Sequence, residues 1–525
     1  MDDVLRTEAR IANLGNLTLA VTGLFIVIGV LAQCTTYLNH DVAWVLYSTS
    51  RMLDGAVYGR DIIEPNLPLA WFLTVPSAAA ARVLGADPIA VFRIFVISIA
   101  LVPLAHAGLT LRSAKSARMR ADSAVLIIAL SYALFVGCYR DFGQREHLSL
   151  ALVLPYLLVT ASRLNGARPS LAAALAFGAV AGVGCTLKPY FLTVPLFVEL
   201  AAMAYSRRWR TMFRAETIAL GFAVAACAAA VLILTPAYLR DVVPLVEEIY
   251  WAYNIEPSAL LLRIRFELVG LAVALVLYWR GERTAFQTVL LAACFGYLVS
   301  YLLQMKGYTY HGLPLRALVP TTLALQLSSL RPGGSAVLWR RALSLGVAGA
   351  AVVLILGPNL NEAVNWYRSA NLRTGPAAHR IGDVVRLVQQ RAANGTFLAL
   401  STHPFPGFPV VLYTDAKWGG RTNSQFLLPA IAKLRAAGTP PSDPLLQNIE
   451  NQARTMLRDD LERAAPALIL VDARKERHAL GPMPFDFVAF YLEDPELSRH
   501  WHDYTELAPI HGYRVFVREA RSAIP

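Results

Sequence analysis

The chain has 525 residues, of which 56% are hydrophobic and 16% are charged, and its mean hydropathy is +0.46. This composition excludes an ordinary soluble enzyme and predicts a polytopic membrane protein. The formal net charge of +12 raises the question of nucleic-acid binding. Most of the excess arginine lies in short linkers between apolar stretches. We therefore assign the charge to membrane topology and expect no nucleic-acid partner.

Eleven apolar stretches predict membrane spans. Each is about as long as the roughly 20 residues that cross a bilayer as a helix. In chain order the predicted spans are 14–32, 89–111, 122–138, 148–163, 171–187, 190–206, 215–235, 259–279, 284–303, 314–330 and 341–357.

The basic linkers define the orientation of these spans. Five linkers are rich in arginine and are therefore expected to be cytoplasmic, namely 112–120, 163–168, 207–214, 280–283 and 331–341. A further apolar stretch at 67–85 would reverse this pattern if it crossed the membrane. We expect it to be an interfacial or re-entrant helix on the outer side. The N-terminus is then inside, and the C-terminal part emerges outside.

The composition changes near residue 358. The chain is thus divided into a transmembrane domain, 1–357, with an outer loop at 33–88, and a C-terminal α/β domain, 358–525. In the C-terminal part, apolar and β-branched runs predict strands, and longer periodic segments predict helices. The expected strands are 396–401, 467–471 and 514–517, and the expected helices are 378–392, 423–437 and 443–464.

The outer loop contains the sequence His40-Asp41 at the start of an amphipathic segment, 42–53, which predicts a helix along the membrane surface. Asp41 stands where that helix begins. One interpretation is a simple helix N-cap, for which aspartate is well suited. The other is a catalytic carboxylate, which at the lipid–water boundary can take a proton from an acceptor hydroxyl or amine.

The loop continues with Arg51-Met52-Leu53-Asp54-Gly55-Ala56-Val57-Tyr58 and then with Asn66-Leu67-Pro68-Leu69-Ala70-Trp71-Phe72-Leu73. This order of an aspartate after the first span, a surface helix, an acidic stretch and a proline-rich entry resembles the GT-C glycosyltransferases. That superfamily includes protein O-mannosyltransferases and the aminoarabinose and galacturonic acid transferases of lipid A. The resemblance covers the membrane region.

The resemblance implies a sugar donor linked to a polyprenyl phosphate and a lipid, glycan or protein acceptor, with membrane lipids around both. It implies that transfer occurs on the periplasmic side of a bacterial inner membrane, with Asp41 matching the catalytic aspartate. The acidic pair usual in the superfamily reads His40-Asp41 here. A divalent metal is therefore left as a possible cofactor, with no ligand set assigned.

Two lysines are notable because only six of the 48 cationic side chains are lysines. Lys188 and Lys306 each follow a predicted span on its outer side, and Tyr310 and His311 follow Lys306 closely. One interpretation is snorkelling of each lysine to the headgroup layer. The other is contact with the phosphate of the donor, to which Tyr310 and His311 would add hydrogen bonds. The alternative for Tyr310 and His311 is that they are structural caps.

Further candidate substrate contacts lie in two outer loops. They are His40, Asp61 and Glu64 in the first loop, and Arg140, Asp141, Glu146 and His147 in the second. For the second loop the alternative is a local network of ion pairs and caps, with a helix starting at Asp141. Glu146-His147 by itself is too few ligands for a zinc site.

In the C-terminal domain, the proline-rich loop 403–409 precedes Asp415, Lys417, Trp418 and Arg421. This segment predicts either a surface on which a sugar stacks or a loop that docks this domain onto the membrane part. Two other functions remain: a lipid or glycan transporter (flippase) and an enzyme like the O-antigen ligases. A transporter would carry charges at mid-membrane on broken helices, whereas here the charges lie at span ends.

Overall fold

The computed structural model of the protein describes residues 2–112, 117–328 and 338–519. The basic linkers expected at 112–120 and 331–341 lie partly outside these residues. The chain folds into two compact units, each assembled from separated segments. The first unit comprises Met1–Thr36, Ala90–Ala230 and Ile255–Arg368, and the second comprises Tyr37–Ile89, Val231–Asn254 and Ser369–Pro525.

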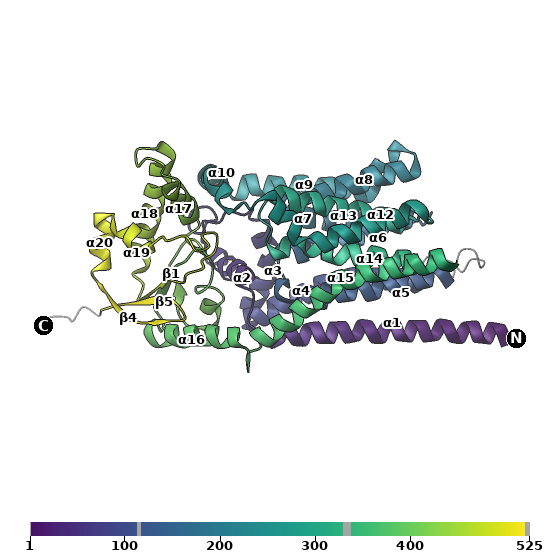
Figure 1. Cartoon of the computed structure of the whole chain (residues 1–525), viewed down its shortest axis with the longest axis horizontal. Coiled ribbons are helices and arrows are strands. Elements are labelled where there is room, and N and C mark those ends of the chain that lie inside the picture. The colour runs from purple at the N-terminus through teal and green to yellow at the C-terminus, as the bar shows by residue number, and fades with distance from the viewer. Residues whose placement is uncertain (1, 113–116, 329–337, 520–525) are drawn as a thin grey trace. The chain divides into compact units, whose positions relative to one another are not determined.

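The first unit is a bundle of helices whose long members run side by side (Figure 1). Short 3-10 or π segments join several of them, including η2 (Tyr139–Asp141), η3 (Pro189–Leu192) and η7 (Thr309–Gly312). The α-helices are α1 (Asp2–Cys34), α4 (Pro88–Arg112), α5 (Ala117–Ser131), α6 (Arg145–Leu164), α7 (Leu171–Thr186), α8 (Thr193–Ser206), α9 (Ala215–Leu234), α11 (Pro257–Arg263), α12 (Arg265–Arg280), α13 (Ala285–Gln304), α14 (Leu313–Ser328) and α15 (Leu338–Ala370).

Helix α6 is the central element of this bundle. All of its side chains from Glu146 to Ala161 are buried, so it is covered on every face by neighbouring helices. Small residues permit close helix contacts elsewhere in the bundle. A Cβ atom placed on Gly296 of α13 would lie 2.5 Å from the Cα atom of Val194 in α8. Glycine at this position therefore allows the two backbones to touch, as is common between membrane helices.

Among the described residues, seven helices are long and apolar enough to cross a membrane. They match seven of the expected spans, beginning with Leu14–Cys34 and Pro88–Leu109. The stretch expected at 171–187 forms the shorter apolar helix α7, and the one at 259–279 is broken at Ile264 into α11 and α12. The total of eleven spans stays a prediction.

The second unit contains helices from the outer loop together with the C-terminal region. The loop contributes α2 (His40–Leu53) and α3 (Leu69–Leu84), and the segment 231–254 contributes η5 (Tyr238–Val242), α10 (Val243–Ile249) and η6 (Tyr250–Tyr253). The C-terminal helices are α16 (Pro376–Arg391), η9 (Val410–Tyr413), α17 (Leu428–Ala436), α18 (Pro444–Ala464), α19 (Phe487–Leu492) and α20 (Pro495–Trp501).

A five-stranded mixed sheet forms the core of the C-terminal region. The strands are β1 (Thr396–Leu400), β2 (Lys417–Trp418), β3 (Leu468–Asp472), β4 (Tyr504–Ile510) and β5 (Tyr513–Arg518), in the order β2-β1-β3-β5-β4. Strand β1 runs parallel to β2 and β3, and β5 runs antiparallel to β3 and β4. Every residue of β3, the central strand of the sheet, is buried.

The predicted fold class is confirmed as a mostly helical chain with several candidate membrane helices and a C-terminal α/β region. The strands and helices expected after residue 377 are present with bounds shifted by a few residues, as is a helix at 42–53. The position of that helix along the membrane surface stays a prediction. Helix α15 runs unbroken through residue 358. The outer loop belongs to the same compact unit as the C-terminal region. The proposed boundary between 357 and 358 stays a prediction.

The expected topology can be tested with single cysteines in a background that lacks Cys34 and Cys227. Ala393 and Ala167 are both exposed, in the C-terminal region and in the linker 163–168. We expect Ala393→Cys to react with an impermeant maleimide on intact spheroplasts, and Ala167→Cys to react only after permeabilisation. Labelling of both positions from the same side would contradict the orientation.

Candidate functional site

The first unit buries an ion pair between Lys188 and Glu146. The Nζ atom of Lys188 lies 2.5 Å from Oε1 of Glu146 and 2.9 Å from Oε1 of Gln304, and it donates to Nε2 of His311 at 3.0 Å. Lys188 is 6% exposed and Glu146 is 0% exposed. Lys188 therefore does not snorkel to the lipid surface, and all three of its N–H groups have partners within the protein.

Several basic side chains meet in this cluster. Lys306 is buried, and burial together with the charges of Lys188 and Arg145 lowers its pKa to about 6. Glu146 is the carboxylate that pairs with Lys188. The helix dipole of α6, which begins at Arg145, adds further positive potential. Such an arrangement favours binding of an anion.

His311 adds an unused hydrogen-bond donor to this cluster. A lysine ammonium group has no acceptor, so Nε2 of His311 accepts from Lys188 and Nδ1 carries the proton. Within the described residues Nδ1 has no hydrogen-bond partner, and neither does Oε2 of Glu146. Burial, with the charges of neighbouring cations, holds the pKa of His311 well below its usual range. The ring is therefore neutral, with one N–H group available for a ligand oxygen.

Tyr310 lies beside the same lysine. Its ring centroid is 5.2 Å from Nζ of Lys188, and it packs edge-on against His311. The structure thus brings together Glu146, Lys188, Tyr310 and His311, which were predicted from three separate loops, with Lys306 close enough to be influenced electrostatically. Gln304 was not predicted, and its only signal was its position two residues before Lys306.

The other candidates in the second outer loop, His147, Arg140 and Asp141, make contacts within the protein. His147 is fully buried, with Nε2 2.9 Å from the carbonyl oxygen of Leu134, and it accepts from the backbone N–H of Gly143 at Nδ1. A single neutral tautomer satisfies both bonds. Nε of Arg140 lies 3.9 Å from Oδ1 of Asp141, which is buried.

The helix expected to begin at Asp141 instead begins at Arg145, because Tyr139–Asp141 forms a 3-10 turn. The predicted helix start at Asp141 is therefore wrong, and the pairing of Asp141 with Arg145 stays a prediction. The roles of Arg140, Asp141 and His147 as substrate contacts stay predictions.

In the second unit, Asp41 lies in the first turn of α2. The N-cap is Asn39, whose side-chain oxygen accepts from the backbone N–H of Asp41 at 2.9 Å. The interpretation of Asp41 as a helix cap is therefore wrong. Its side chain is 25% exposed, and Oδ1 lies 3.7 Å from Nε2 of His40. The carboxylate is thus both accessible and adjacent to an imidazole.

Two histidines of the C-terminal region, His403 and His478, lie near His40 and Asp41. The ring of His403 lies 4.3 Å from that of His40 and 5.6 Å from that of His478. Burial lowers the pKa of both His403 and His478, and the charge of Asp41 partly opposes this for His478. Both rings are neutral near pH 7. His478 could not be found from the sequence, because it lies 75 positions after His403.

The other acidic candidates of the first loop are held by its own backbone and side chains. Glu64 is 2% exposed and accepts from Nε1 of Trp44 at 2.7 Å and from the backbone N–H of Asn66. Asp61 is paired with Arg60 at 2.9 Å, and this contact holds the pKa of its carboxyl below the usual range. Their predicted roles in substrate binding remain untested.

The proline-rich loop 403–409 packs onto helix α2. The ring of Phe408 lies 5.1 Å from Trp44 and 5.7 Å from Tyr47. Trp418 is 5% exposed, and its indole N–H donates to the carbonyl of Thr422. Trp418 is therefore a packing residue and offers no open face to a sugar. The loop therefore packs on helix α2 within the second unit, and its docking onto the membrane part stays a prediction.

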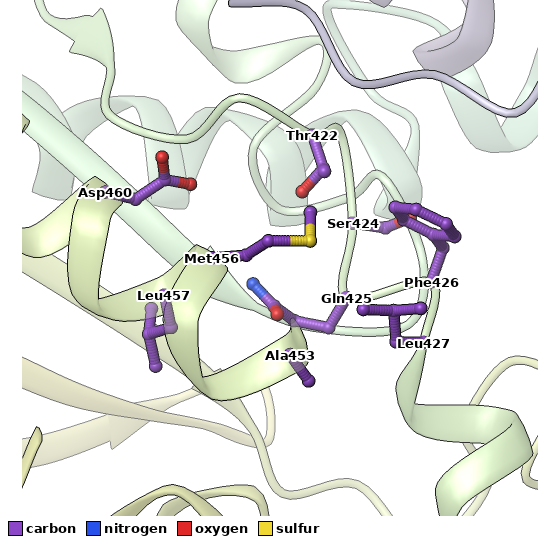
Figure 2. A pocket seen from close by; sticks show the side chains of 9 residues that line it. All are labelled: Thr422, Ser424, Gln425, Phe426, Leu427, Ala453, Met456, Leu457 and Asp460. Carbon is purple, nitrogen blue, oxygen red and sulfur yellow. The ribbon is translucent and has the colours of Figure 1, made fainter. Parts of the chain in front are cut away.

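Two cavities lie outside these clusters, and their volumes differ greatly. In the first unit, a cavity of about 340 Å³ is lined by Tyr308, Arg316, Glu267 and Glu362 among others, and so adjoins the segment that follows Lys306. In the C-terminal region, a pocket of about 10 Å³ lies beside Asp460 (Figure 2). The side chain of Met456 extends from α18 into it. This pocket has room for one water molecule and none for a sugar.

A metal site was left open by the sequence. Across residues 2–112, 117–328 and 338–519, no three His, Cys, Asp or Glu side chains are arranged to hold a metal ion. The cluster of His40, Asp41, His403 and His478 thus has suitable ligand types but does not have the geometry of a metal centre in this conformation.

No protein-family model matches the sequence, and a comparison with curated proteins also gives no match. Among solved structures, the chain is similar to the Archaeoglobus fulgidus oligosaccharyltransferase, described as a complex with Zn and sulfate. The sequence identity is 10% and the TM-score is 0.44, over 94% of this chain and 73% of that one. A likeness at this TM-score carries no conclusion about activity, substrate or partners.

The Lys188–Glu146 pair can be tested by a double-variant cycle. Removing one partner of a buried pair typically costs about 3–5 kcal/mol, because the remaining charge is left uncompensated. We expect Glu146→Gln to lower the thermal stability of the detergent-solubilised protein strongly, and Lys188→Met in addition to restore part of it. Glu247→Gln, at an exposed position, is the control. Equal stability of Glu146→Gln and the control would contradict the role of the pair.

Proposed function

We propose that this chain is an integral-membrane glycosyltransferase of the GT-C type. It transfers a sugar from a polyprenyl-phosphate-linked donor to a lipid, glycan or protein acceptor on the outer face of a bacterial inner membrane. The observation that carries this proposal is the cluster that holds the buried Lys188 and Lys306, the half-buried Arg145 and Glu146. Its basic groups suit the oxygens of a phosphate, as does the N–H of His311, which has no partner within the described residues.

The reaction divides between the two kinds of chemistry found in the chain. An acceptor hydroxyl or amine attacks the anomeric carbon of the donor, and the bond from that carbon to the phosphate oxygen breaks. Asp41 takes the acceptor proton, and the neutral imidazoles beside it can pass that proton on. Cleavage leaves negative charge on the departing polyprenyl phosphate, and cationic groups beside that phosphate would stabilise it.

Asp41→Asn tests the catalytic role directly. Losing a positioned acid–base group typically lowers turnover by about 10²–10⁴-fold, and we expect a loss in this range with normal membrane insertion. The matched control is Asp87→Asn, since asparagine can keep the contact in which Asp87 accepts from the backbone N–H of Ile89. Near-normal turnover of Asp41→Asn, measured as sugar transferred from a radiolabelled polyprenyl-phosphate sugar, would remove Asp41 from catalysis.

A second test uses the pH dependence of donor binding. Because the pKa of Lys306 is about 6, the amine is neutral in the free protein above that pH. Binding of a phosphate favours the protonated form, so binding takes up a proton, and affinity falls as pH rises above 6 by up to about tenfold per unit. We expect this slope for a short polyprenyl phosphate between pH 6 and 8.

Lys306→Arg provides the control for this slope, because arginine stays charged throughout the range. It should bind the polyprenyl phosphate with a much flatter pH profile, whereas Lys306→Met should bind weakly at every pH. The apparent affinity for the acceptor should not change in either variant. An identical pH profile for the native protein and Lys306→Arg would show that Lys306 does not contact the phosphate.

Mass spectrometry of lipid A, glycans and cell-wall polymers from a deletion strain would identify the sugar and its acceptor. We expect one class of these molecules to lose a single sugar residue and to regain it when the native chain is restored. Restoration by the Asp41→Asn variant would contradict the proposal.

A further inference from the structure

The second unit contains a basic groove that the proposed chemistry does not use. It has a volume of about 570 Å³ and lies between helices α2 and α3 of the outer loop and the C-terminal sheet. Three cationic residues line it: Arg51 at the end of α2, Lys417 in β2 and Arg463 near the end of α18. Arg51 follows Asp41 by ten residues in the same helix, which places it about 15 Å away along the axis.

The charges of this groove are incompletely balanced. Its one acidic lining residue, Asp54, is paired with Arg82 at 2.9 Å. Arg463 shares the carboxylate of Asp460 with Arg421. Arg51 has a buried Nη1 atom without a hydrogen-bond partner in the described residues. Lys417 is exposed, and within the same part of the chain no ion pair of it is found. Two cations are therefore available to a ligand.

The walls of the groove indicate where this ligand comes from. Ala78 of α3 and Pro88 line it, and Pro88 is also the first residue of the candidate membrane span Pro88–Leu109. Helix α3 ends in Val83 and Leu84, which are 84% and 72% exposed, as expected for residues that contact lipid. The groove thus begins where a span would leave the hydrocarbon, at the depth of lipid phosphates.

We infer that this groove binds the phosphate headgroup of an anionic membrane lipid. Arg51 and Lys417 would hold the phosphate oxygens, the hydroxyl groups of Tyr47 and Ser50 would lie beside them, and the acyl chains would follow the apolar wall at Ala78 and Pro88. The site would anchor the outer loop and the C-terminal region to the bilayer surface. It does not depend on the sugar-transfer proposal, because no part of that chemistry enters it.

The inference can be tested by native mass spectrometry of the delipidated full-length protein. We expect short-chain phosphatidylglycerol to bind at least tenfold more tightly than phosphatidylcholine. Lys417→Gln should weaken the binding of phosphatidylglycerol about tenfold, as expected for loss of one charge-assisted contact. The matched control is Lys475→Gln, because Lys475 is equally an exposed lysine of the C-terminal region but does not line the groove.

Arg51→Gln should have an effect similar to that of Lys417→Gln. Because Arg51 is partly buried, the exposed Lys417 remains the deciding variant if Arg51→Gln fails to fold. Equal binding of the two lipids, or equal binding by Lys417→Gln and Lys475→Gln, would overturn the inference. Competition by inorganic phosphate at the same concentration as the lipid would also overturn it, because the ligand would then be a soluble phosphate.

Discussion

The first unit depends on the cost of burying positive charge. Lys188 is almost inaccessible to water, and it is tolerated because Glu146, Gln304 and His311 provide one partner for each of its N–H groups. These partners come from the start of α6, the end of α13 and the η7 turn, so the pair joins three separate parts of the bundle. The central position of α6, covered on all faces, keeps water away and makes this arrangement strong.

The same constraint shapes the electrostatics of this cluster. Several basic side chains meet at one centre, and burial limits the screening of their charge by water. Lys306 responds by a lowered pKa, and His311 remains neutral with a free N–H group. These basic groups would stabilise a ligand that brings negative charge, which is the basis of the proposed phosphate binding.

In the second unit, helix α2 has a comparable organising role. Its first turn carries Asp41, its middle packs against Phe408 through Trp44 and Tyr47, and its last turn carries Arg51. Backbone contacts add to this packing, since the N–H of Trp418 donates to the hydroxyl of Tyr47 at 2.9 Å. The C-terminal region therefore supplies His403 and His478 to the surroundings of Asp41 and Lys417 to the groove at the opposite end of the helix.

The sequence by itself determined the membrane class, most of the spans and most of the C-terminal secondary structure. Apolar length and periodicity report directly on burial of a helix or strand, so these features need no knowledge of the partner elements. It also singled out Asp41, Glu146, Lys188 and His311, because ionisable residues are rare near spans and have few neutral explanations there.

Only the tertiary structure decided how these residues are used. Ion pairing between Lys188 and Glu146 spans 42 positions, and the contact of Lys188 with His311 spans 123. Neither pairing leaves a periodic signal in one sequence, because the partners are selected by helix packing. For the same reason, the capping of α2 by Asn39, the burial of Trp418 and the approach of His478 to Asp41 could not be predicted. Local pattern specifies which residues are buried, whereas the packing of distant segments specifies which of them meet.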